Sequence, residues 1–228
     1  MKTIAVIVAG GSGTRFGAEV PKQFLSLGGK PILMRTIEAF DQALTDGDHG
    51  IVVTLPADQM ALWRELCERY AFNVPHRVVP GGETRWHSVK NALGSIGDPA
   101  GVDVIAVHDG VRPLASKELI RRTLEAARST GAAIPVVTLN DSVRQVDGDT
   151  SHALDRSSLR AVQTPQAFDA RLLLEAYGQP FDPTFTDDAS VVERYGHGVT
   201  LVDGDPQNLK ITRPMDLALA EYLLDNDA

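Results

Sequence analysis

The segment from Val8 to Gly17 contains the residue types and the spacing that point most directly to chemistry. It reads Val-Ala-Gly-Gly-Ser-Gly-Thr-Arg-Phe-Gly, it continues an apolar run, and a Pro-Lys-Gln sequence with Lys22 follows it. Glycines let a backbone turn tightly and bring its N–H groups close to the phosphates of a ligand. Arg15 and Lys22 would stabilise negative charge on such phosphates. The segment therefore favours phosphate binding, and a plain strand-to-helix turn is the structural alternative.

Other catalytic motifs fit this sequence poorly. The dinucleotide fingerprint needs a third glycine where Phe16 stands, and the Gly-Lys-Ser/Thr of a P-loop is absent. Thr14 replaces the last glycine of a Gly-x-Ser-x-Gly nucleophile elbow. No two of the six histidines have the spacing of zinc ligands, and no Ser/His/Asp order stands out. A nicotinamide-dependent dehydrogenase, a zinc enzyme and a serine hydrolase are therefore all disfavoured.

Further motifs of polar and charged residues follow in order along the chain. They are Gly81-Gly82-Glu83-Thr84-Arg85 through Ser88, His108-Asp109-Gly110-Val111-Arg112-Pro113, Asp155-Arg156, Gln163-Thr164-Pro165-Gln166, Thr186-Asp187-Asp188-Ala189-Ser190 and Asn208-Leu209-Lys210-Ile211-Thr212-Arg213-Pro214. The glycine-rich loop with its two cations resembles the nucleotidyltransferases that build activated sugars and alditols. The whole ordered set resembles one family from end to end of the chain: 2-C-methyl-D-erythritol 4-phosphate cytidylyltransferase of the non-mevalonate isoprenoid pathway.

The resemblance implies a fold, a reaction and an assembly. The fold would be of the α/β class, a Rossmann-like nucleotidyltransferase with a doubly wound, mostly parallel sheet and a protruding β-arm that interlocks a homodimer. The reaction would join CTP to a sugar-alcohol phosphate and release pyrophosphate, with Mg²⁺ bridging phosphate oxygens. Such chemistry depends on positioning and on cations, and it needs no covalent nucleophile.

The resemblance also implies catalytic roles. Arg15 and Lys22 would stabilise charge on the triphosphate while the α-phosphorus is attacked. Arg156 and Lys210 would clamp the phosphate of the acceptor, with Arg156 reaching in from the arm of the other subunit. Asp109 would help to hold the Mg²⁺.

The remaining implied positions bind the two substrates. They are Ala9, Gly10, Gly11 and Gly13 for the triphosphate, Gly81, Gly82 and Ser88 for the cytosine, Ser142, Thr164 and Thr186 on the acceptor side, and Arg112 in support of Asp109 or the acceptor. The sequence departs from the family pattern in two places. The loop begins with Ala-Gly-Gly where many relatives have Pro-Ala-Ala-Gly, and Ser142 keeps a hydroxyl where Thr is common.

Each of these residues also has a structural alternative. Asp109 can belong to a turn after a strand, and Asp187 can be the N-cap of a helix. Lys210 can be a solvated lysine at a strand end, and Arg156 taken by itself would be a surface arginine. His108 is expected to be a packed, hydrogen-bonded core residue rather than a base.

Two other functions also remain open. Ribitol 5-phosphate and other alditol phosphates present one phosphate and several hydroxyls too, so the sequence discriminates poorly between acceptors. The arm sequence Asp-Ser-Val-Arg at residues 141–144 favours methylerythritol phosphate. A nucleotide-binding module without catalysis would be expected to lack Arg15 or Lys22, and both are present.

The elements that would position these residues alternate along the chain. Apolar runs at residues 4–9, 50–55, 77–79, 104–107 and 133–139 predict strands that are apolar on both faces, which is typical of a parallel sheet covered by helices. Helical patterns lie between them at residues 32–44, 57–70, 83–96 and 116–129, with Ser116 as the expected N-cap of the last. This order favours a doubly wound fold, in which ligands bind at the carboxyl ends of the strands.

The alternation stops between residues 140 and 163. That stretch is polar, Asp-Gly-Asp at residues 147–149 is a turn signal, and residues 142–146 favour one side of a hairpin. A long excursion of this kind is a lid or an arm that grips a second subunit. Helices at 169–177 and 187–195, a strand at 199–202 and a helix from Pro214 follow. We expect a single domain over residues 1–228, with a dimerisation arm at about 140–163.

Composition and charge exclude several classes of protein. Of the 228 residues, 43% are hydrophobic and 23% charged, which argues against disorder or a fibre. The formal net charge of −8 at pH 7 argues against coating nucleic acid or an anionic membrane, although it allows a small phosphorylated ligand. The single cysteine, Cys67, excludes internal disulfides and is expected in the core. Since no apolar run approaches the ~20 residues of a membrane helix, we expect a cytoplasmic protein.

Overall fold

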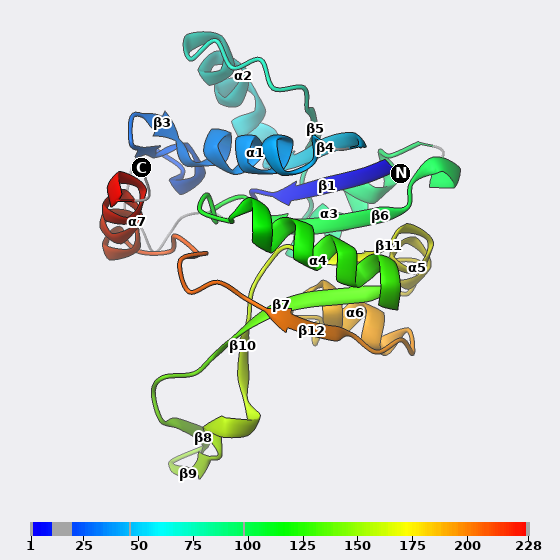
Figure 1. Ribbon diagram of the computed structural model, residues 1–228, viewed down its shortest axis with the longest axis vertical. Coiled ribbons are helices and arrows are strands. Elements are labelled where there is room, and N and C mark those ends of the chain that lie inside the picture. Colours follow the sequence, from blue (N-terminus) through cyan, green and yellow to red (C-terminus); the bar gives the residue numbers. More distant parts are fainter. Residues whose placement is uncertain (1, 11–19, 46, 98, 227–228) are drawn as a thin grey trace.

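A mostly parallel sheet lies at the centre of the molecule (Figure 1), in a computed structural model that describes residues 2–10, 20–45, 47–97 and 99–226. Four neighbouring parallel strands are, in spatial order, β5 (Arg77–Pro80), β4 (Asp48–Leu55), β1 (Lys2–Val8) and β6 (Val104–Asp109). The first strand stands in the middle and the chain winds outward from it in both directions, which is the doubly wound arrangement. Val8 of β1 is paired with Asp109 of β6, so the carboxyl ends of these strands lie side by side.

Beyond β6 the sheet is mixed. β11 (Gln166–Asp169) lies antiparallel between β6 and β7 (Ala132–Thr138). β12 (Thr200–Asp203) is parallel to β7, and β10 (Arg160–Val162) is antiparallel to it. Strand β11 is not among the strands expected from the sequence, because Gln-Ala-Phe-Asp is too short and too polar at its ends to form an apolar run.

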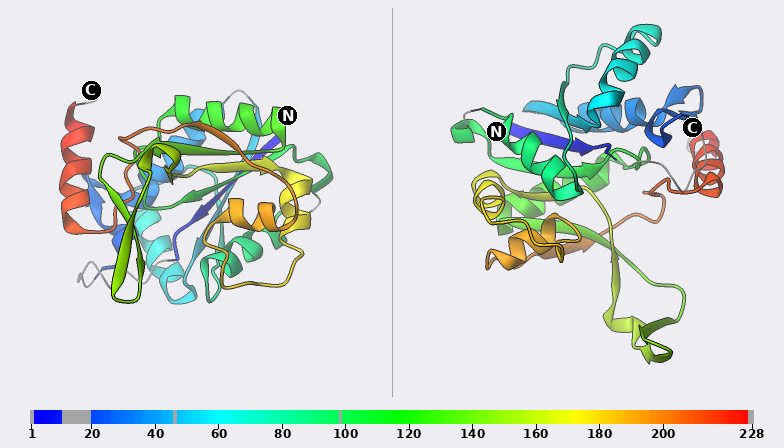
Figure 2. Two further views of the ribbon diagram at one scale, coloured as in Figure 1. Left: turned by 90° about the horizontal axis from the view of Figure 1, so that it is seen from below. Right: turned by 180° about the vertical axis from the view of Figure 1, so that it is seen from behind.

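Helices cover both faces of the sheet (Figure 2). α1 (Ile32–Ala43), α2 (Met60–Arg69) and α4 (Lys117–Thr130) share one core cluster with Ala5 and Ile7 of β1. α3 (Arg85–Gly94), α5 (Ala170–Ala176) and α6 (Asp188–Arg194) share another with Ile4 and Val6. Since side chains alternate along a strand, neighbouring residues of β1 enter opposite cores, which explains its continuous apolar run. Among the described residues no helix is long and apolar enough to cross a membrane.

Side-chain caps fix the starts of helices α3, α4 and α6. Ser116 caps α4, as the sequence predicts, Thr84 caps α3, and Asp187 caps α6 within a capping box. A cap satisfies N–H groups that the first turn leaves unpaired and contributes about 1 kcal/mol. The first residues of α3 and α6, Arg85 and Asp188, therefore start from well-defined backbone positions.

The β8–β9 hairpin and helix α7 lie at the periphery (Figure 1). β8 (Val143–Asp147) and β9 (Thr150–Leu154) form an antiparallel hairpin whose residues are mostly exposed and which projects away from the sheet. Ala220 of α7 (Pro214–Asn226) belongs to the same core cluster as Leu27. A hairpin and a helix are thus confirmed where the sequence predicts them. The short elements are β2 (Ser26–Leu27), β3 (Lys30–Pro31) and the 3-10 turns η1 (Lys22–Phe24), η2 (Ala57–Gln59), η3 (Pro99–Gly101) and η4 (Arg156–Ser158).

Candidate active site

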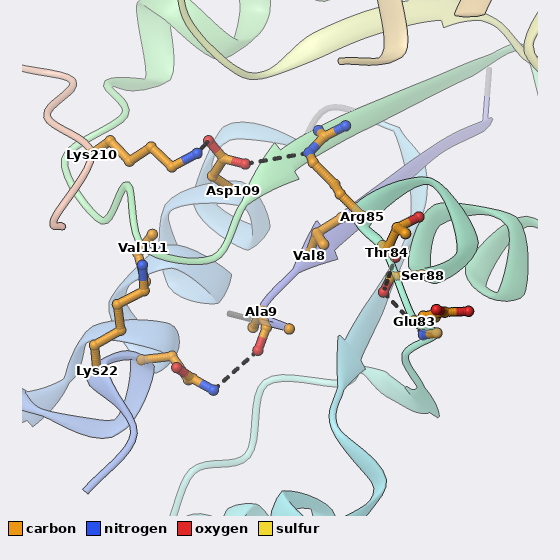
Figure 3. Close-up of a pocket in the computed structure, with 13 residues that line it drawn as sticks. Val8, Ala9, Lys22, Glu83, Thr84, Arg85, Ser88, Asp109, Val111 and Lys210 are labelled. Carbon is orange, nitrogen blue, oxygen red and sulfur yellow. Dashed lines mark hydrogen bonds and ion pairs between the residues drawn. The ribbon is translucent and has the colours of Figure 1, made fainter. Parts of the chain in front are cut away.

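A cavity of about 240 Å³ opens at the carboxyl ends of β1 and β6, beside the start of α3 (Figure 3). This is the edge at which open α/β sheets bind their ligands. The residues singled out in the sequence that line it are Ala9, Gly10, Lys22, Gly82, Ser88, Asp109 and Lys210. The fold thus brings together residues from five separate motifs.

The wall of the cavity at the start of α3 is built from small residues and one hydroxyl. The Gly82 N–H donates to Ser88 Oγ at 3.0 Å, and that hydroxyl donates to the Thr84 carbonyl at 3.0 Å. A Cβ atom added to Gly82 would lie 2.4 Å from the Cβ of His87, and one added to Gly81 would lie 3.1 Å from Ser88 Oγ. Larger residues are therefore excluded at position 82. Without a side chain there, a planar group of a ligand can approach the backbone.

Asp109, at the end of β6, meets three cations from distant parts of the chain. Its Oδ2 lies 2.9 Å from Lys210 Nζ and 3.3 Å from Arg112 Nε, and its Oδ1 lies 3.7 Å from Arg85 Nε. In Figure 3, Lys210 and Arg85 approach the carboxylate from opposite sides. We call these four residues the charged floor. Since cations outnumber the carboxylate, the charged floor is suited to an anionic ligand.

The surrounding cations keep the carboxylate of Asp109 ionised. Burial by itself raises its pKa, but the charges of Arg85, Lys210 and Arg112 outweigh burial and hold the pKa well below the usual range of an aspartate. Burial alone would likewise lower the pKa of Arg85, and its ion pair with Asp188 raises it above the ordinary value. The carboxylate of Asp109 is therefore available as an anionic oxygen ligand at neutral pH.

Hydrogen bonds behind the charged floor hold the end of β6 in place. The Asp109 N–H donates to Thr164 Oγ1 at 3.1 Å, and Thr164 Oγ1 lies 3.1 Å from His108 Nδ1. His108 Nε2 lies 3.1 Å from the Arg112 carbonyl, which can only accept, so Nε2 carries the proton and Nδ1 accepts from the Thr164 hydroxyl. Burial lowers the pKa of His108 to about 4. The ring is therefore neutral and supports the structure, in line with its expected place in the core.

The segment next to Lys210 is tied to the same region. Arg112 Nη1 donates to the Asn208 carbonyl at 2.7 Å, and Asn208 Nδ2 donates to the Thr164 carbonyl at 2.8 Å. Asn208 is completely buried, whereas the side chain of Lys210 is 43% exposed. The backbone beside Lys210 is thus fixed while its ammonium group can still meet a ligand.

The residues on either side of the glycine-rich loop meet at the cavity. Lys22 begins η1 and lines the cavity, and the adjacent Gln23 is buried. Gln23 Nε2 donates to the Ala9 carbonyl at 3.1 Å and to Gln59 Oε1 at 2.5 Å. Ala9, at the start of the loop, and the turn after the loop are therefore held together. Three residues assigned from the sequence lie outside the described residues: Gly11, Gly13 and Arg15.

Comparison with known proteins points to the family that the motifs resemble. The sequence model of 2-C-methyl-D-erythritol 4-phosphate cytidylyltransferase matches residues 3–226. The Bacteroides fragilis protein of that name is 50% identical over 220 residues, which cover 96% of this chain and 98% of that protein. The corresponding Geobacillus thermodenitrificans protein is 39% identical over 226 residues and 96% of each chain. The chain belongs to the 2-C-methyl-D-erythritol 4-phosphate cytidylyltransferase family.

Solved structures of this cytidylyltransferase family share the fold. The enzyme from Thermus thermophilus is 33% identical and superposes with a TM-score of 0.78 over 99% of this chain and 100% of that chain. The 4-diphosphocytidyl-2C-methyl-D-erythritol synthase from Anaerococcus prevotii is 29% identical, with a TM-score of 0.81 over 98% of both chains. The predicted resemblance and the predicted α/β class with a mostly parallel sheet are therefore confirmed.

In this member of the cytidylyltransferase family, four residues predicted for the acceptor side do not line the cavity: Arg156, Ser142, Thr186 and Thr164. Arg156 is exposed on η4 at the base of the arm, where it donates to the Asn140 carbonyl. Ser142 is exposed just before β8, and Thr186 is exposed just before α6. Thr164 is buried, and its hydroxyl is engaged by the Asp109 N–H and the His108 ring.

Two charged residues have no role in the assignment from sequence, although one of them lines the cavity. Arg85 and Asp188 lie within quoted motifs but receive no role there, and in the structure Arg85 Nη2 lies 2.6 Å from Asp188 Oδ2. A partial signal exists for Asp188 alone, because it directly follows Asp187, a possible helix N-cap. Nothing in the local pattern says that they are partners, since 103 residues separate them.

The donor set fits a divalent metal that takes most of its ligands from a substrate. Within the described part of the chain, no group of three or more His, Cys, Asp or Glu residues could hold a metal ion by itself. Asp109 is a buried, ionised carboxylate on the cavity, and Mg²⁺ commonly uses one or two such carboxylates together with substrate phosphates. Three neighbouring cations oppose binding of the metal alone, so the negative charge of a triphosphate should accompany it.

Proposed function

We propose that this chain transfers the cytidylyl group of CTP to 2-C-methyl-D-erythritol 4-phosphate, giving 4-diphosphocytidyl-2-C-methyl-D-erythritol and pyrophosphate. The observation that carries the proposal is the cavity with its charged floor, in a chain that belongs to the cytidylyltransferase family. The cavity presents an excess of positive charge to a triphosphate and a wall of small residues to a base. The names of the relatives favour methylerythritol phosphate over ribitol 5-phosphate as the acceptor.

The chain's cations account for the chemical step. An oxygen of the acceptor phosphate attacks the α-phosphorus of CTP and forms a new P–O bond. The bond from the α-phosphorus to the bridging oxygen breaks, and its electron pair leaves with pyrophosphate. Lys22 on the cavity, together with Arg15, would stabilise the negative charge that builds up on the triphosphate. A phosphate anion needs no base to become a nucleophile, which agrees with the neutral, buried ring of His108.

The glycine-rich loop and the start of α3 would hold the nucleotide. The backbone at Ala9, Gly10, Gly11 and Gly13 is assigned to the triphosphate, and Gly81, Gly82 and Ser88 are assigned to the cytosine. Support comes from the low wall at Gly82, where the Ser88 hydroxyl is already oriented by two hydrogen bonds.

We assign Mg²⁺ to Asp109. When bound, the ion would neutralise and orient the phosphate oxygens of CTP. For Lys210 to meet the acceptor phosphate it must shift from Asp109 Oδ2, and a carboxylate that ligates the metal would release it. Lys210 can make this shift because its side chain is partly exposed.

The acceptor side requires a second subunit. Arg156, Ser142 and Thr186 lie off the cavity of their own chain, so we propose a homodimer in which the arm at about 140–163 brings Arg156 to the site of its partner. Thr164 would act by holding the Asp109 backbone rather than by touching the acceptor. We also propose that residues 1–228 form a single domain and that the protein works in the cytoplasm, where its single cysteine would stay reduced.

Pyrophosphate release tests the proposal directly. The assay contains the protein, CTP and Mg²⁺ and compares methylerythritol 4-phosphate with ribitol 5-phosphate, with UTP and ATP as nucleotide controls. We expect fast release only with CTP and methylerythritol phosphate. Release with ribitol phosphate instead would overturn the acceptor while keeping the catalytic assignments. Absence of release with both acceptors, from folded protein, would favour the non-catalytic nucleotide-binding module.

A further inference from the structure

Arg85 joins two carboxylates that belong to different parts of the site. Its Nε lies 3.7 Å from Asp109 Oδ1 on the charged floor, and its Nη2 lies 2.6 Å from Asp188 Oδ2. Arg85 is the first residue of α3, and Asp188 is the first residue of α6. One guanidinium therefore connects the helix that borders the assigned nucleotide wall with the helix that follows Thr186.

Asp188 is placed so that Arg85 cannot easily turn away. Its side chain is completely buried, and its other oxygen, Oδ1, accepts a hydrogen bond of 2.6 Å from the Tyr177 hydroxyl. Its N–H donates to Gln166 Oε1 at 3.0 Å. Removing the partner of a buried charge is strongly destabilising, so the pair restricts the orientation of the guanidinium.

The other two cations of the charged floor are anchored elsewhere. Arg112 and Lys210 both approach Oδ2 of Asp109, and Arg112 continues to the Asn208 carbonyl. Within the described residues, Arg85 is thus the cation of the charged floor that has an ion pair with α6. A movement of Asp109 Oδ1 toward a bound metal or phosphate would therefore be transmitted to Asp188 through Arg85.

We propose that Arg85, held by Asp188, is a positioning residue that couples the nucleotide side of the site to the segment around Thr186. This inference rests on the proposed function for the identity of the two sides. Nucleotide binding at Asp109 fixes Arg85, Arg85 fixes the start of α6, and α6 orders the adjacent Thr186 for the acceptor. Arg85 reaches the two carboxylates through two different nitrogens of a rigid plane, whereas a lysine carries its charge on a single nitrogen.

Amide hydrogen exchange of residues 184–195 tests the coupling with CTP and Mg²⁺ alone. In the wild-type protein, CTP should slow exchange in this segment by about fivefold or more, which corresponds to a coupling of about 1 kcal/mol. In Arg85→Lys, which keeps the charge, and in Asp188→Asn, the slowing should fall below about twofold. Arg194→Lys is the matched control, because Arg194 forms an exposed ion pair with Asp182 at the other end of α6. It should respond like the wild type.

A second variant separates positioning from folding. Arg85→Gln combined with Asp188→Asn removes both buried charges together, and such paired replacement is often tolerated by the fold. We expect this protein to stay folded, and its α6 exchange should no longer respond when CTP is saturating. We also expect the KM for the acceptor to rise about tenfold in Asp188→Asn, which lies outside the charged floor, with the KM for CTP changed less than about twofold. A wild-type exchange response in the double variant, or equal changes in both KM values, would overturn the proposal.

The outcomes for the inference and for the proposed function can be told apart. Turnover by the wild type without a CTP response in α6 would refute the coupling and leave the function intact. A CTP response without release of pyrophosphate from any acceptor would support the coupling and refute the function. If neither is seen, both are wrong.

Discussion

The charged floor and the β8–β9 arm each carry a cation that we assign to the acceptor phosphate, in opposite physical settings. Lys210 lies 2.9 Å from Asp109, and Arg85 and Arg112 also form ion pairs with this carboxylate. Arg156 is exposed on η4 and contacts the carbonyl of Asn140 on the arm itself. The floor draws its residues from separate parts of the chain, whereas the arm is stabilised by its own hairpin.

The difference shows how the site divides two tasks. Asp109 and Arg112 of the charged floor are only about a tenth exposed, so their ion pair is strong and its geometry is set before a ligand arrives. The arm buries little and gains little order from its own chain, so its orientation should depend on what it packs against. A rigid nucleotide site and an acceptor clamp supplied by a partner would follow from this contrast. The predictions below test it, in order of decreasing effect.

Replacing Lys22 should give the largest loss. Lys22→Ala removes a cation on the cavity, and the loss of one such preorganised group costs about 10²–10³-fold in kcat. The melting temperature should change little, since the residue is half-buried in the turn η1 rather than in a core cluster. Steady-state kinetics and thermal unfolding measure the two quantities. Lys30→Ala, which breaks a peripheral ion pair with Glu38, is the control; equal turnover in both variants would remove Lys22 from the mechanism.

The stability of the folded protein should be sensitive to acid through His108, which lies next to the charged floor. The arm should not contribute to this sensitivity. The ring has an ordinary pKa of 6.5 in the unfolded chain, and burial lowers its pKa to about 4 in the folded protein. Between these pH values the unfolded state binds more protons, so stability falls as the pH drops through this window, by on the order of 3 kcal/mol in total. Above pH 6.5 this contribution is constant.

Urea unfolding at a series of pH values checks this expectation. His108→Gln should flatten the dependence between pH 6.5 and about 4, even if it lowers stability overall. His152→Gln, an exposed position on β9 of the arm, should keep the wild-type slope. Identical slopes in wild type and His108→Gln would show that the buried ring does not set the acid response.

Replacing Arg156 should weaken binding of the acceptor and leave binding of the nucleotide unchanged. A lost hydrogen bond to a charged group costs about 1.5–3 kcal/mol, so Arg156→Ala should raise the KM for the acceptor by about 10- to 100-fold. The KM for CTP and the melting temperature should stay near the wild-type values, because the side chain is exposed. Arg144→Ala, elsewhere on the arm, is the matched control, since Arg144 bonds Ser151 within the hairpin.

Mixing subunits decides whether the arm acts in its partner's site. Dimers of one Lys22→Ala chain and one Arg156→Ala chain should contain one intact site, so random mixing should restore about a quarter of the wild-type activity. Recovery of no activity, from variants shown to exchange subunits, would contradict a shared site.

The smallest effect is expected at the tip of the arm. Val146 is 72% exposed, so Val146→Ala should change the free energy of unfolding by less than about 0.5 kcal/mol. Ile105→Ala, at a fully buried position of β6, should cost about 2–5 kcal/mol. Chemical denaturation at low protein concentration measures both. A loss above about 1 kcal/mol for Val146→Ala that does not depend on concentration would mean that the arm packs on its own chain.

Much of the fold could be predicted from local patterns. The apolar runs of β1, β4 and β6, the caps at Ser116 and Asp187, and the turn at 147–149 are all properties of short segments. Strand β11 could not be predicted in this way, because its four residues are held by pairing with β6 and β7 rather than by their own pattern. The end of the first strand also differs from its prediction. Ala9, expected within that strand, lies one residue beyond the end of β1.

The sequence by itself determined which chemical groups this protein brings to a phosphate: glycine-rich turns after strands, a set of cations and a carboxylate in a recognisable order. These depend on residue type and spacing, which are local. Only the tertiary structure decided that Asp109 meets Lys210, Arg112 and Arg85, and that Arg85 also meets a buried Asp188. Such pairs depend on how the sheet aligns strand ends and how helices pack across it, because the energy of an ion pair depends on a distance of a few ångströms and on burial rather than on separation along the chain.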